Sequence, residues 1–126
     1  MKIIVCDIVI NSSGISVKFS TEFGKAKAIW IGTDPKIGKE YFVEVEIPDI
    51  LIWGKDIFET EEGLQIANEN DTISIVGLFE SIDEDGYAVL RHGISIIPVV
   101  TQGVPCALGT YVKLFANNVI LYEVEY

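Results

Sequence analysis

The chain has 126 residues, a net charge of −10 at neutral pH, and a composition that is 49% hydrophobic and 22% charged. This apolar content excludes a disordered chain, and the length predicts one domain over residues 1–126. Residues 92–112 carry no formal charge but contain two prolines and three glycines, which excludes a membrane helix there. The N-terminus lacks a signal-peptide pattern, so we expect a cytoplasmic protein without membrane contact.

The first third of the chain predicts three strands. Residues 2–10 are mostly apolar on both faces, which is typical of a central strand. Residues 15–20 alternate apolar and polar side chains, and the turn residues 11–14 join them to the first strand as a hairpin. A short strand over residues 26–31 follows.

The next segment is less uniform. Residues 40–47 alternate cleanly and end at Pro48, which predicts a strand with one face exposed. Residues 49–58 and 64–69 each fit either a short strand or a helical turn, and both alternatives stay open.

Residues 72–99 predict three consecutive strands, over 72–82, 87–91 and 94–99, joined by tight turns. Gly77 interrupts the first of them, and a glycine inside a strand marks a bulge, a bend or a close backbone approach. Small closed sheets need such bends. Pro98 lacks a backbone donor, so the third strand either ends there or lies at an edge.

Asn117 and Asn118 predict a two-residue turn between strands 109–116 and 119–126, because asparagine tolerates positive φ. In that hairpin one face would carry an aromatic group with one lysine, namely Tyr111, Lys113, Tyr122 and Tyr126. Tyrosines suit base stacking and protein interfaces, and the alternative interpretation is the mouth of a barrel interior.

These elements together predict an all-β fold with eight to nine short strands and little or no helix. The spacing of turns favours a small antiparallel barrel or sandwich, OB-like or SH3-like.

The negative charge is concentrated in the middle of the chain. Residues 40–85 hold 14 acidic side chains and one lysine. Such a segment attracts a basic protein and repels nucleic acid, although acidity also serves solubility alone. The function predicted first is therefore a non-enzymatic binding module, for example an immunity protein that neutralises a basic toxin. Its predicted partner-binding residues are Glu44, Glu46, Asp56, Glu59, Glu61 and Glu62.

The alternative function is an OB-type domain that binds single-stranded nucleic acid or an oligosaccharide through the tyrosine-rich face. Nucleic acid is the less favoured of these ligands because of the net charge.

No catalytic, metal or cofactor motif was found, so we expect none of these activities. His92, the only histidine, precedes Gly93 and is predicted to lie in a solvated turn. Asp83–Asp85 fit a turn better than a calcium loop. Cys6 and Cys106 are 100 positions apart, and they are either two reduced thiols or one disulfide.

Overall fold

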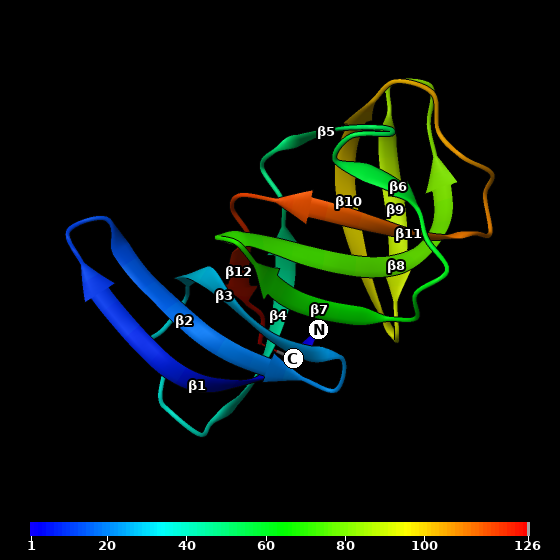
Figure 1. The fold of residues 1–126 in the computed structure, drawn as a ribbon. Coiled ribbons are helices and arrows are strands. Elements are labelled where there is room, and N and C mark those ends of the chain that lie inside the picture. Colours follow the sequence, from blue (N-terminus) through cyan, green and yellow to red (C-terminus); the bar gives the residue numbers. More distant parts are fainter. Residues whose placement is uncertain (126) are drawn as a thin grey trace.

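The computed structural model describes residues 1–125, which form twelve strands and no helix, with 64% of the residues in strands (Figure 1). The all-β prediction is confirmed. The prediction of eight to nine strands is wrong, because the two ambiguous segments are both extended. Residues 49–58 form two short strands rather than one element, and residues 64–69 form a third.

Five strands close a barrel, which we call the barrel hereafter. They are β1 (Lys2–Asn11), β2 (Gly14–Thr21), β3 (Gly24–Ile31), β4 (Glu40–Glu46) and β12 (Ile120–Glu123). Around the barrel they follow the order β1-β2-β3-β12-β4 and return to β1. Only β3 and β12 run parallel, and the other four pairs are antiparallel. Of the two predicted alternatives, this connectivity is the OB-like one.

Period-2 alternation explains which side chains fill the barrel. In β3, Ala26, Ala28 and Trp30 are buried while the residues between them are exposed. The Trp30 ring meets the edge of Tyr41 from β4 at a centroid distance of 4.8 Å. Small alanines beside these large rings let the curved sheet close.

The remaining strands lie between β4 and β12 in the sequence, and we call them the inserted sheet. They are β5 (Ile50–Ile52), β6 (Ile57–Glu59), β7 (Gln65–Glu69), β8 (Thr72–Ile82), β9 (Tyr87–His92), β10 (Ser95–Gln102) and β11 (Tyr111–Ala116). Figure 1 shows these green-to-orange strands on one side and the blue β1 and β2 on the other. One cluster of buried hydrophobic side chains runs through both parts; a single domain over residues 1–126 stays a prediction.

Gly77 lies where β8 changes neighbours. One edge of β8 pairs with β7 up to Val76 and with β9 from Leu78 onward. A Cβ at Gly77 would lie 3.0 Å from the backbone oxygen of Arg91. The glycine therefore marks a close approach of two backbones, one of the three features that the sequence predicts there.

Pro98 lies within β10, which continues to Gln102. At this position β10 has β9 as a neighbour, while β5 joins its other edge only from Val100. Pro98 thus occupies an edge position, the second predicted alternative.

The predicted hairpin around Asn117 and Asn118 is wrong. β11 pairs with β6 and β8, whereas β12 pairs with β3 and β4. The backbone N–H of Asn117 instead donates to the carboxylate of Asp49, 2.8 Å away. The segment therefore returns the chain from the inserted sheet to the barrel.

The barrel and the inserted sheet meet at the turn between β2 and β3. Gly24 pairs with Ile66 of β7, and the N–H of Ile66 donates to the Phe23 carbonyl at 3.1 Å. A Cβ at Gly24 would lie 2.0 Å from the Ile66 carbonyl oxygen, and its φ of +142° disfavours any other residue. Gly24 therefore permits this close contact between the barrel and the inserted sheet, which we call the joint.

Candidate functional site

The outer face of β3, β12 and β4 presents a compact group of apolar and acidic side chains. The pairing register places Ile31, Tyr122 and Glu44 in one row across the three strands. The next row holds Ile29, Ile120 and Glu46. These residues point outward because Trp30, Leu121 and Val45, which alternate with them, are buried. We call these six residues the outer patch.

The outer patch is accessible. Ile31 is 47% exposed and Ile29 is 38% exposed, although both are large apolar side chains. The Tyr122 hydroxyl donates a hydrogen bond to the carboxylate of Glu46, and this bond raises the pKa of Tyr122. The Glu44 carboxylate, among residues 1–125, accepts no hydrogen bond and forms no ion pair. The patch thus has an apolar centre, a fixed tyrosine and an acidic edge.

The other four predicted partner-binding residues lie in or beside β6 of the inserted sheet. Asp56 accepts a hydrogen bond from the N–H of Ile52 at 2.9 Å, which fixes a local turn. Glu62 forms an ion pair with Lys113 at 3.0 Å, and this lysine lowers the pKa of Glu62. Glu59 and Glu61 are exposed. The six predicted acids therefore divide between the barrel and the inserted sheet.

The predicted tyrosine-rich face is not assembled as a hairpin face. Tyr111 lies on β11 in the inserted sheet, whereas Tyr122 lies on β12 in the barrel. Lys113 is only 12% exposed at its side chain and lies between Glu62 and Glu69. Tyr126 lies outside the described residues. The hairpin face is not assembled because β11 pairs with β8 instead of β12.

A basic surface that the sequence analysis missed covers β2 and β3. Lys18 is directly opposite Lys27 across the two strands, and Lys25 lies two residues away on the same face. Among residues 1–125, none of the three forms an ion pair. Like charges in opposite positions destabilise a sheet. The alternation of lysine with alanine in residues 25–28 was the available signal.

The prediction for His92 is wrong. His92 is the last residue of β9 and is buried, since it follows Ala88 and Leu90 on the inward face. Burial lowers its pKa. Its Nδ1 lies 2.9 Å from the Val76 carbonyl oxygen. The adjacent glycine suggested a turn, but the alternation with two buried residues was the stronger signal.

Among residues 1–125, no group of three or more potential metal ligands occurs. Cys6 and Cys106 are both free thiols, so the disulfide alternative is wrong.

None of the described residues belongs to a helix that is long and apolar enough to cross a membrane. Comparisons with family models, with curated proteins and with solved structures gave no match.

Proposed function

We propose that this chain is a non-enzymatic binding module that recognises a basic protein through the outer patch. The observation that carries the proposal is the row structure of the patch, in which three isoleucines and a tyrosine adjoin Glu44 and Glu46. Protein interfaces combine an apolar, aromatic centre with a polar rim, and tyrosine is enriched among their energetically dominant residues.

The charge of the inserted sheet supports a basic partner. Residues 47–119 contain eleven acidic and three basic side chains, whereas the rest of the chain has eight acidic and six basic ones. Several of the inserted acids are engaged by Lys113 and Arg91, but Glu59 and Glu61 are exposed. A surplus of negative charge accelerates the approach of a basic protein. The inserted sheet would then steer the partner, and the outer patch would hold it.

A small inhibitor of a basic toxin, such as an immunity protein, fits this division of roles. Such an inhibitor needs no catalytic group, and the one histidine is buried against a backbone carbonyl. It acts in the cytoplasm, the location that the sequence favours.

Paired variants test the proposal. Tyr122→Ala with Ile31→Ser should abolish capture of the specific partner from the native host. The control, Tyr87→Ala with Ile96→Ser, makes the same changes at exposed positions of the inserted sheet. With the purified partner, the loss of one aromatic anchor should weaken binding by about 30-fold. Added salt should slow association without unfolding the protein.

Two results would refute the proposal. One is equal capture by the patch variant and the control. The other is an association rate that does not depend on salt.

A second candidate function is supported by the lysines of β2 and β3. OB barrels bind oligonucleotides and oligosaccharides over this pair of strands. Here Lys18 and Lys27 stand opposite each other, and neither forms an ion pair within residues 1–125. The alternative ligand face then moves from the tyrosines to these strands.

A titration decides between the two candidates. Under the second candidate function, labelled single-stranded oligonucleotides bind the wild type at low salt, and Lys18→Ala with Lys27→Ala removes the binding. Lys36→Ala with Lys55→Ala makes the same charge change at exposed positions elsewhere and should bind as before. No binding by the wild type eliminates nucleic acid as a ligand.

A further inference from the structure

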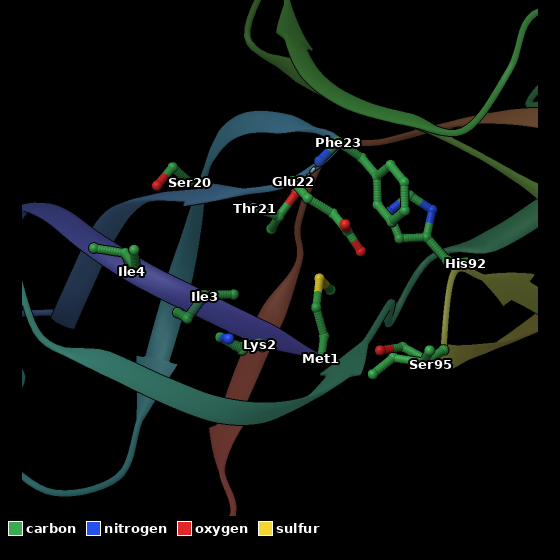
Figure 2. A pocket seen from close by; sticks show the side chains of 11 residues that line it. Met1, Lys2, Ile3, Ile4, Ser20, Thr21, Glu22, Phe23, His92 and Ser95 are labelled. Atoms are coloured by element: carbon green, nitrogen blue, oxygen red, sulfur yellow. Dashed lines mark hydrogen bonds between the residues drawn. The ribbon is translucent and has the colours of Figure 1, made fainter.

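A cavity of about 410 Å³ lies where the turn between β2 and β3 meets the turn between β9 and β10 (Figure 2). Its apolar walls include Met1, Ile4, Phe23 and Ile94. Cavities of this volume, with mostly apolar walls and a few polar groups, commonly hold small molecules. It is separate from the outer patch and from the lysines of β2 and β3.

His92 brings an unsatisfied acceptor to this cavity. A carbonyl oxygen only accepts hydrogen bonds, so the Nδ1 of His92, 2.9 Å from the Val76 oxygen, carries the proton. Burial lowers the pKa of His92, which keeps the ring neutral at pH 7. Its Nε2 is therefore a bare lone pair, and this buried atom has no hydrogen-bond partner among residues 1–125. Such atoms are rare in proteins and call for an explanation.

Phe23 packs against the His92 ring. The Phe23 ring lies edge-on to the imidazole with a centroid distance of 4.9 Å, and its side chain is only partly buried. Figure 2 shows the two rings in contact, with Glu22 beside them. A Cβ at Gly93 would lie 2.8 Å from the Phe23 ring and 3.8 Å from the Glu22 carboxylate. Glu22 and Phe23 thus lie directly over the turn that follows His92.

The cations near the cavity already have partners, whereas the Glu22 carboxylate makes no hydrogen bond or ion pair within residues 1–125, although its charge acts on His92. Lys2 pairs with Glu40 at 3.4 Å, and the amino group of Met1 donates to the Val43 carbonyl at 2.7 Å. The exposed Glu22 carboxylate, within residues 1–125, accepts no hydrogen bond and forms no ion pair. The acceptors left without a partner therefore call for a ligand that donates.

We propose that this cavity binds a small molecule with a primary ammonium group on a compact apolar body. The ammonium lies between the Glu22 carboxylate and the Nε2 of His92, and the body rests against Ile4 and Ile94. The Phe23 ring turns aside to admit the ligand, a motion open to partly exposed side chains. This site is independent of the proposed protein partner.

Three probes with one apolar body test the proposal: 2-phenylethylamine, 2-phenylethanol and ethylbenzene. Because His92 is the only histidine, its Nε2 gives a single resonance in the nitrogen spectrum of histidine-labelled protein. The amine should move this resonance saturably and bind about tenfold more tightly than ethylbenzene. No saturable shift with the amine, or equal affinity for ethylbenzene, would overturn the proposal.

Variants test the Glu22 carboxylate and the Phe23 ring. Glu22→Gln should weaken the amine about tenfold and leave 2-phenylethanol unchanged. Glu84→Gln, an equal charge change at an exposed turn, should alter neither. Phe23→Ala should strengthen amine binding about threefold, because no side chain then has to be moved. Equal loss in the two glutamate variants, or no gain in Phe23→Ala, counts against the site.

Discussion

Gly24→Ala is expected to destabilise the protein far more than Gly14→Ala. Both glycines follow a turn and have similar backbone angles, with φ of +142° and +124°. An added Cβ would lie 2.0 Å from the Ile66 carbonyl oxygen at Gly24, whereas at Gly14 it would meet no atom of residues 1–125 within 4 Å. Comparing the two variants therefore separates the cost of the positive φ from the cost of the clash with Ile66.

The expected magnitudes follow from these contacts. Positive φ costs an alanine about 1 kcal/mol at either position. At Gly24 the clash involves backbone, so β7 must move and the hydrogen bond from Ile66 to Phe23 is lost, for about 2 kcal/mol more. We expect about 1 kcal/mol for Gly14→Ala and about 3 kcal/mol for Gly24→Ala. For a chain of this size, the difference corresponds to about 8 °C in Tm.

Urea unfolding measures the stability of both variants, and the two tryptophans report on different parts of the protein. Trp30 lies in β3 of the barrel, whereas Trp53 follows β5 in the inserted sheet. Fluorescence of Trp30→Phe and Trp53→Phe proteins reports each part separately. We expect coincident transitions, since one hydrophobic cluster joins the parts. Equal destabilisation by the two alanines would refute the account of the joint.

Further predictions concern three buried or paired side chains. The free energy of unfolding should fall as the pH drops below about 6.5, because the unfolded chain binds the proton that buried His92 resists. His92→Gln should reduce that slope in urea titrations at several pH values. Leu121→Ala should cost about 2–5 kcal/mol, since this fully buried side chain lies on the closing strand of the barrel. Lys113→Met removes the ion pairs with Glu62 and Glu69. It should cost less than about 1 kcal/mol, by an amount that shrinks in salt, because water reaches both glutamate side chains, which are 46% and 44% exposed.

Local patterns in the sequence predicted the strands well, because burial on one face forces alternation. Residues 15–20 and 40–47 alternate cleanly, and both form strands of the barrel. The same rule would have placed His92 inside, as it shares a face with Ala88 and Leu90. A turn residue next to it, Gly93, outweighed that pattern in the sequence interpretation.

Strand pairing could not be read in the same way. The residues around Asn117 have the pattern of a hairpin, yet the partner of β11 is β8, far earlier in the chain. Such pairing depends on the total apolar area that the sheet buries. This area cannot be deduced from the sequence pattern of one short segment. For the same reason Tyr111 and Tyr122 were predicted on one face and lie in different parts of the structure.

The position of β12 in the chain bears on how the protein folds during its synthesis. The barrel is closed by Ile120–Glu123, which a ribosome makes only after the whole inserted sheet. Until then, β3 and β4 of the nascent barrel have open edges, and unpaired edges favour aggregation. A ribosome stalled near residue 110 should therefore hold a protease-sensitive β1–β4 segment that becomes resistant once residue 123 has left the exit tunnel.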